Sequence, residues 1–209
     1  MKKEEINELY KESVEKGYSK RMQELLIKLG ANTRSVYDLI TMTPYQAHDL
    51  LIEEIKSKNP DFELIKGILE YSVIDVNSKD SNGQTALTWA AEWGKEKPVE
   101  LLLNHPGINV NLQGKWCCTA LMWAALEGKE KVVELLLNHP GIDVNLKDDE
   151  GQTALMLAMG LMAKEKVVEL LLNHPGIDVK ARNLYKGDTA WSLATDSIRQ
   201  KFPKLNPNS

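Results

Sequence analysis

Three of the four histidines recur at matching places in this chain, within the repeated segment Asn-His-Pro-Gly-Ile. They are His105, His139 and His174. An imidazole can bind a metal or carry a proton. Zinc needs each nitrogen about 2 Å away, whereas packed helices lie about 8–10 Å apart. Histidines one copy apart therefore cannot easily share an ion, and the spacing favours a structural role in a turn.

The two cysteines are adjacent, at Cys117 and Cys118. They replace a Gly-Gln or Gly-Asp pair in the other copies. Glycine there is expected to take a positive φ that strains a cysteine, so this loop should differ in shape. No histidine or further cysteine falls nearby in the repeat register. One hypothesis for the function is a thiol-dependent switch or enzyme centred on Cys117-Cys118; it is the alternative to a protein without catalytic activity.

Other patterns that would indicate catalysis are missing from the sequence. We find no glycine-rich phosphate loop, His-Glu-x-x-His motif or nucleophile elbow. The recurring acids Glu100, Glu134 and Glu169 are interpreted as solvated helix faces. The sequence therefore predicts a protein that is not an enzyme and has no catalytic residue, no metal and no cofactor.

Composition narrows the choice of partner and compartment. The formal net charge is -4 and the pI is about 5.7, which argues against nucleic acid as a partner. No secretory leader and no run of 18 apolar residues is present, so a membrane span is not expected. Two cysteines make no disulfide framework, which favours a reducing, cytoplasmic location. Export by a route without an N-terminal signal stays open.

The histidines belong to a longer repeat. The segment VELLLNHPGI begins at Val99, Val133 and Val168. Thr-Ala pairs begin at 85, 119, 153 and 189, with spacings of 34, 34 and 36. Residues 129–144 and 164–179 are identical over 16 positions. A period of this length indicates a solenoid, a propeller or an array.

The pattern within one copy predicts a pair of short helices and a loop. Residues 119–128 carry apolar residues at helical spacing and end at Gly128, and 129–138 form a second apolar helix that stops at Pro140-Gly141. A polar stretch then leads to the next Thr-Ala. Helices of about ten residues are unstable alone, so each must bury its apolar face on a neighbouring copy. The expected fold class is an all-α solenoid of helix-turn-helix units with hairpin-like loops.

These units resemble the ankyrin repeat. The matching residues are Gly83-Gln-Thr85-Ala-Leu-x-x-Ala-Ala91, Gly94, Val99-Glu-Leu-Leu-Leu103 and Val110-Asn111, and the pattern recurs in register over about residues 75–200. The family's Thr-Pro-Leu-His is altered here to Thr-Ala-Leu-Thr88 and its counterparts, which removes the usual histidine hydrogen bonds. The resemblance implies a non-enzymatic scaffold. The 34-residue form with Asn-His-Pro-Gly-Ile is similar to repeats of bacteria that live inside host cells, which implies an effector secreted into a host cell and acting on a host protein.

The sequence divides into six segments on this register. A helix start at Thr43-Pro44 and a helix after Asp61 predict a degenerate repeat before the regular ones, and Trp191, Leu193, Ala194, Ile198 and Phe202 are expected to close the C-terminal end. The alternative for the first segment is a separate small helical domain. The segments are a degenerate N-terminal unit or cap at 1–42, a degenerate repeat at 43–74, repeats at 75–108, 109–142 and 143–177, and a capping repeat at 178–209.

Positions that vary between copies while their flanks stay constant are the candidates for binding. The resemblance implies that a partner protein is bound by the polar loops and the exposed side of the first helices, on a concave surface. Trp93 and Trp116 stand out because tryptophan is favoured at binding hot spots; the alternative is that each packs on a neighbouring hairpin. Trp89 and Trp123 are expected to be interior. The predicted partner-binding residues are Ser81, Asn82, Glu92, Trp93, Lys115, Trp116, Leu126, Glu127, Glu150, Gln152, Leu161 and Tyr185. We expect a monomer, with self-assembly through the leucine-rich repeats as the alternative.

Overall fold

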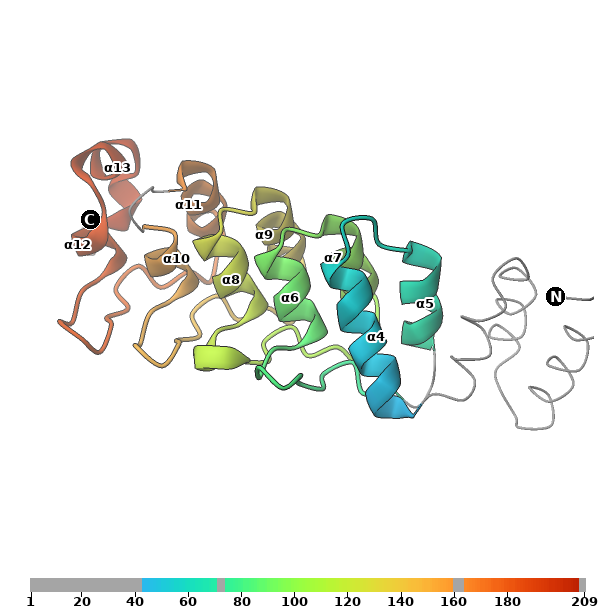
Figure 1. Cartoon of the computed structure of the whole chain (residues 1–209). Helices are drawn as coiled ribbons and strands as arrows, with labels where there is room; N and C mark the ends of the chain where they lie inside the picture. The colour runs from blue at the N-terminus through green and yellow to red at the C-terminus, as the bar shows by residue number, and fades with distance from the viewer. Residues whose placement is uncertain (1–42, 71–73, 160–163, 207–209) are drawn as a thin grey trace, which may run out of the picture. The chain divides into compact units, whose positions relative to one another are not determined.

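The computed structural model describes residues 43–70, 74–159 and 164–206 (Figure 1). The two helices predicted within 1–42 and the candidate Leu161 lie outside the described residues. The chain divides into two compact units, residues 1–75 and 76–209.

The first unit contains a helix pair of the predicted kind. Helix α4 runs over Pro44–Lys56 and α5 over Phe62–Glu70. The N-cap Thr43 accepts a hydrogen bond from the Gln46 backbone N–H, and the Gln46 side chain accepts one from the Thr43 backbone N–H. This reciprocal pair satisfies two N–H groups that the first turn leaves without helical partners. The large side chains of this pair that are fully buried are Leu51, Ile55, Ile65 and Ile68.

The second unit is a series of short helix pairs. Each pair has a first helix that begins after a Thr-Ala step and a second helix that follows a tight turn. In Figure 1 the first helices α6, α8 and α10 form one row and the second helices α7, α9 and α11 form another. The pairs are α6 (Ala86–Glu92) with α7 (Glu96–Leu103), α8 (Ala120–Leu126) with α9 (Glu130–Leu137), α10 (Ala154–Leu157) with α11 (Glu165–Leu172), and α12 (Ala190–Leu193) with α13 (Asp196–Lys201). Two 3₁₀ turns, η1 (Lys115–Cys117) and η2 (Pro203–Leu205), complete the described elements.

Threonine hydroxyl groups cap the N-termini of the first helices, where the histidines of the family are missing. Thr85 Oγ1 accepts a hydrogen bond from the Thr88 N–H at 3.1 Å, and Thr88 Oγ1 in turn accepts one from the Thr85 N–H at 2.8 Å. Thr189 and Ser192 make the same exchange at 3.3 and 3.0 Å. These side chains supply the caps that a helix start needs. The substitution of the family's histidine therefore leaves the helix start capped.

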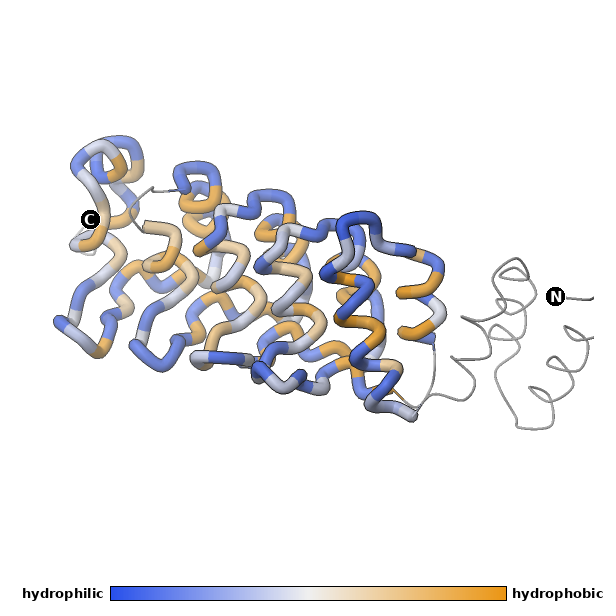
Figure 2. Tube along the Cα trace, in the orientation of Figure 1, coloured by the Kyte–Doolittle hydropathy of each residue, from blue (hydrophilic) through white to orange (hydrophobic). Residues whose placement is uncertain are grey.

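The middle leucine of each repeated Leu-Leu-Leu run lies in the core. Leu102, Leu136 and Leu171 occupy the same place in α7, α9 and α11, and none of them is exposed. Figure 2 shows the hydrophobic colour along the helices and the hydrophilic colour at the loops between them. The apolar face is narrower than expected, because Leu135 and Leu137 are only partly buried. At the C-terminal end Leu205, which the sequence did not single out, is fully buried with Ile198.

An asparagine in each copy connects the turns of neighbouring copies. The Asn111 side chain donates to the Gly141 carbonyl at 2.7 Å and accepts from the Asp143 N–H at 2.8 Å. Asn77 bonds to Gly107 and Asn109 in the same way, and Asn145 to Gly176 and Asp178. The series ends where lysine replaces the next asparagine, at Lys180. These side chains hold successive copies in a fixed register.

Replacing Asn111 with alanine should therefore destabilise the array. The change leaves one carbonyl and one N–H without this partner, and we expect a loss of about 1–2 kcal/mol in the free energy of unfolding. Urea denaturation followed by circular dichroism measures it. Asn138→Ala is the control, because that exposed side chain makes no hydrogen bond to a described residue. Equal losses in the two variants would show that the bridging bonds contribute nothing.

The described residues are helical apart from turns and loops. They contain no β-strand, and the isolated antiparallel bridge between Lys79 and Thr85 is the closest approach to one. This agrees with the predicted all-α class. Within the described ranges, no helix has the length and apolar character needed to cross a membrane.

Candidate functional site

The three repeated histidines close the turn after each second helix. His105 Nδ1 accepts a hydrogen bond from the Gly107 N–H at 3.1 Å, and His139 and His174 do the same with Gly141 and Gly176 at 3.2 Å. Each ring is thus bound within its own turn. This is the structural role that the spacing predicts. Among the described residues, no three His, Cys, Asp or Glu side chains are grouped so that they could hold a metal ion.

The two cysteines lie in a loop whose backbone differs from its counterparts. Cys117 keeps the positive φ of its glycine counterparts, 55° against 76° for Gly83 and 77° for Gly151. The difference lies at Trp116, which also has a positive φ, 56°, within the 3₁₀ turn η1. Cys117 is exposed, whereas Cys118 is buried. Burial, followed by the negative charges of the neighbouring acidic loop, raises the pKa of the Cys118 thiol to about 12. A thiol of this kind stays protonated at neutral pH and is a poor nucleophile.

The loops that join one helix pair to the next form a connected row. We call residues 79–84, 113–118, 147–152 and 182–188 the finger loops. The Asp149 N–H donates to the Trp116 carbonyl at 3.2 Å, and the Leu184 N–H donates to the Glu150 carbonyl at 2.9 Å. Side chains add further bonds, from Gln113 Nε2 to the Lys147 carbonyl and from Lys147 Nζ to the Arg182 carbonyl. The three later finger loops therefore lie side by side.

Each of the first two finger loops also contacts the first helix of its own pair. The Trp89 indole donates to Asp80 Oδ2 at 2.8 Å, and Gln84 Nε2 donates to Glu92 Oε2 at 3.1 Å. In the next copy the ring of Trp116 lies 5.6 Å from that of Trp123, at an interplanar angle of 39°. In these two copies the finger loop and the first helix therefore form one surface.

Two aspartates in matching loops differ in their electrostatics. Asp80 Oδ1 accepts from the Asn82 and Gln84 N–H groups, and Asp148 Oδ1 accepts from the corresponding pair in its own loop. Burial opposes ionisation of Asp80, but these bonds and the Trp89 indole hold its pKa below the ordinary value. Asp148 has no tryptophan donor, and burial raises its pKa.

Removing Asp80 should therefore cost more stability than removing Asp148. At pH 7 we expect Asp80→Ala to lower the free energy of unfolding by about 1 kcal/mol more than Asp148→Ala, the difference being the bond to the indole. A lowered pKa stabilises the fold only while the folded-state carboxylate is ionised, so the gap should shrink as pH falls through that pKa. Denaturation at pH 7 and pH 3 measures both effects. A gap that widens in acid would contradict this assignment.

The predicted binding residues are distributed over this surface, with two of them only partly exposed. Glu92 is half-buried and accepts the bond from Gln84, and Gln152 is half-buried and donates to Glu150 Oε2 at 2.9 Å. The exposed candidates are Ser81, Asn82, Trp93, Lys115, Trp116, Leu126, Glu127, Glu150 and Tyr185. The structure thus brings most candidates to the finger loops and to the ends of α6 and α8.

The two singled-out tryptophans are exposed and each rests on an inner tryptophan. Trp93 is 46% exposed and meets Trp89 edge to face at 6.1 Å between ring centroids. Trp116 is 55% exposed and covers Trp123, which is 6% exposed. Trp123 is interior as predicted, but Trp89 is only partly buried because its indole reaches out to the loop. Trp93 and Trp116 are therefore exposed, as predicted, and each also packs on a neighbouring tryptophan, as the alternative interpretation held in part.

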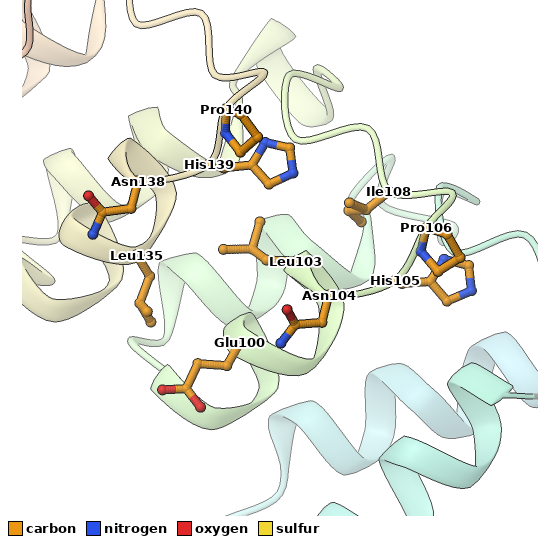
Figure 3. A pocket seen from close by; sticks show the side chains of 10 residues that line it. All are labelled: Glu100, Leu103, Asn104, His105, Pro106, Ile108, Leu135, Asn138, His139 and Pro140. Atoms are coloured by element: carbon orange, nitrogen blue, oxygen red, sulfur yellow. The ribbon is translucent and has the colours of Figure 1, made fainter.

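A groove of about 570 Å³ lies on the second helices (Figure 3). Its lining comes from α7, α9 and the turns after them, with Leu103 and Leu135 supplying apolar area and Glu100 and Asn138 supplying polar groups. The Leu-Asn-His-Pro segment that lines it recurs unchanged in the next copies. Because these residues recur as part of the turn in each copy, they need no ligand to explain them. The groove is therefore a suitable control surface for tests of binding at the finger loops.

Three residues of the finger loops were missed by the comparison of copies. They are Asp149, Leu184 and Lys186. Leu184 is 75% exposed beside Tyr185, and the Lys186 Nζ lies 5.6 Å from the Tyr185 ring centroid. An apolar residue within a polar loop was the available signal for Leu184. Asp149 carried no such signal, because its role depends on its contact with Trp116.

These features define a class of protein: a helical repeat protein whose stacked helix pairs present a row of protruding loops. The family described as ankyrin repeats (3 copies) matches residues 13–114, 51–148 and 107–183, and the chain belongs to it. Ankyrin repeats are generally protein–protein interaction modules and are typically non-enzymatic. No curated protein matches the chain.

Proposed function

We propose that this protein is a non-enzymatic scaffold that binds a partner protein through the finger loops and the exposed ends of α6 and α8. The observation that carries the proposal is the exposure of Trp93 and Trp116 at positions that vary between otherwise similar copies. Large aromatic side chains supply much of the energy of protein interfaces. Their support by inner tryptophans reduces the entropy lost when a partner orders them.

The features of the second helices favour this face over the opposite one. Exposed positions of α7, α9 and α11 carry the same Lys–Glu pairs, such as Lys97–Glu100 and Lys131–Glu134. Solvated pairs of this kind contribute little energy. A surface that repeats without variation offers a partner nothing by which to recognise one copy, whereas the finger loops differ from copy to copy.

Photo-crosslinking of the full chain tests the proposed face. A benzophenone amino acid is placed at Lys115 or Tyr185 in the finger loops, and at Lys131 or Glu134 on α9 as the control. We expect a crosslinked partner from the finger-loop positions and little from α9. Crosslinks that form only from α9 would contradict the proposal, as would crosslinks that join two copies of this chain.

We further propose that the protein acts as a monomer in the cytoplasm or, after export, on a protein of a host cell. Sedimentation tests the first part, because self-assembly through the leucine-rich repeats would give larger species. The host-cell role rests on the resemblance of the Asn-His-Pro-Gly-Ile turn to repeats of intracellular bacteria. Identifying the crosslinked partner by mass spectrometry tests it: a host protein supports that role, and a partner from the same cell contradicts it.

Replacing the cysteines distinguishes the scaffold from the alternative, a thiol-dependent switch at Cys117-Cys118. A scaffold should keep its partner when both cysteines are replaced by serine, because the exposed Cys117 and the buried Cys118 would then contribute no chemistry that serine lacks. Loss of the partner in a well-folded double-serine variant would support the switch.

A further inference from the structure

The last three finger loops present an ordered series of chemical groups. Trp116 with Lys115 stands at one end, Asp149 and Glu150 lie in the middle, and Tyr185 with Leu184 stands at the other end. The backbone bonds from Asp149 to Trp116 and from Leu184 to Glu150 fix this order. Gly151 adds to the close approach, because a Cβ there would meet the Leu184 side chain at 2.7 Å. A ligand that follows the row must meet these groups in turn.

The aromatic ring at each end of the row already has a lysine ammonium group beside it. Lys115 Nζ lies 4.1 Å from the Trp116 ring centroid, and Lys186 Nζ lies 5.6 Å from that of Tyr185. An ammonium over a ring satisfies its electronegative face. What each end still lacks is apolar contact, since Trp116 is 55% exposed and Tyr185 is 83% exposed. The complementary ligand groups at the two ends are therefore apolar side chains.

The middle of the row carries negative charge that the chain leaves available. Asp148 uses Oδ1 for two backbone N–H groups of its own loop, and Glu150 accepts one bond from Gln152. Asp149 is exposed, and its carboxylate pairs with no residue of the described part. After burial, the charges of Asp148 and Asp149 are the next causes that raise the pKa of Cys118, which lies in the neighbouring finger loop. The complementary group is a cation, and a guanidinium fits paired carboxylates best.

We propose that the finger loops at Trp116, Asp149 and Tyr185 bind an extended segment of the partner in which one basic residue, best an arginine, lies between two apolar residues. This rests on the proposed function and specifies the chemistry of the partner. The basic side chain pairs with Asp149 and Glu150. The apolar side chains cover Trp116 at one end and Leu184 with Tyr185 at the other.

The repeat spacing sets the spacing within the segment. Neighbouring copies lie about 8–10 Å apart, so the two ends of the row are about 16–20 Å apart. An extended chain rises about 3.3 Å per residue. The apolar residues should therefore be separated by about five or six positions, with the arginine near the middle. A segment of the pattern apolar-x-x-Arg-x-x-apolar meets all three contacts.

Selection from a random library of twelve-residue peptides displayed on phage, against the full chain, tests the proposal. We expect enriched peptides to carry an arginine or lysine with apolar residues about three positions on either side. A synthetic copy of the most enriched peptide is then measured by fluorescence polarisation. Binding should weaken at least about tenfold in Asp149→Lys, because a favourable charge contact becomes a repulsive one. Glu134→Lys makes the same change of net charge on α9 and should leave the affinity within about twofold.

The outcomes separate this proposal from the one on which it rests. Enriched peptides without a basic residue, or basic peptides bound equally by Asp149→Lys, would overturn the basic-segment proposal. If binding of those peptides is nevertheless lost in Trp116→Ala, the finger loops remain the binding face. Absence of any enriched peptide overturns the basic-segment proposal too, and peptides indifferent to both finger-loop variants contradict both proposals. Circular dichroism of each variant establishes that it is folded.

Discussion

Replacing Leu136 with alanine is expected to lower the free energy of unfolding by about 2–5 kcal/mol. Leu136 is fully buried in α9, whose helix contacts both α7 and α11. Truncation removes apolar contacts and leaves a cavity that the neighbouring short helices cannot easily fill. Because each copy is stabilised by its neighbours, the loss should spread beyond one repeat. Urea denaturation followed by circular dichroism measures the shift.

Leu137→Ala is the matched control for this change. Leu137 is the next residue of α9 and is only partly buried. The same chemical truncation there should cost markedly less, since less apolar surface returns to water. Equal losses at the two positions, or a loss below about 1 kcal/mol at Leu136, would contradict the assignment of the core.

The double change Trp93→Ala and Trp116→Ala is expected to weaken partner binding by about 2 kcal/mol or more, which is at least about thirtyfold in Kd. Both side chains are exposed, and each would bring a large apolar area to an interface. The protein should stay folded. Each ring packs on one inner tryptophan, so the loss of both pairs should lower the free energy of unfolding by about 1–3 kcal/mol, less than the ~3–5 kcal/mol expected for truncating a buried tryptophan. Binding to the crosslinked partner and the melting temperature are measured on the same variants.

The inner tryptophans provide the control for this pair. Trp123→Ala should destabilise the protein strongly, because only 6% of Trp123 is exposed. If the double variant at Trp93 and Trp116 unfolds as readily as Trp123→Ala, the outer tryptophans are packing residues. If binding survives in a folded double variant, the interface lies elsewhere.

Much of the fold could be predicted from the sequence because the same apolar pattern recurs in every copy. Apolar positions that stay constant across copies and recur at helical spacing predicted the buried face, which includes Leu102 and Leu136. The role of the histidines in the turns was also predicted correctly, because each ring accepts a hydrogen bond within its own turn. The stop at Gly128 and the start at Thr119 fixed the helix bounds to within a residue or two.

The site was harder to predict because its contacts run between copies. Asp149 looks like any solvated acid until its N–H is seen to bond to the Trp116 carbonyl. Trp89 and Trp123 share a register, yet only Trp89 meets an aspartate, because Gly114 stands where the first loop has Asp80. The Trp123 indole N–H accordingly has no acceptor among the described residues. A single copy of the pattern cannot show such differences.

Hydrogen exchange of the full chain with and without its crosslinked partner tests the central claim most directly. The claim is that the finger loops and the ends of the first helices make the interface. We predict slower exchange at residues 113–118, 147–152 and 182–188 and no change at the turns after α7 and α9. Protection confined to those turns, around the groove between Leu103 and Leu135, with unchanged finger loops, would contradict the account.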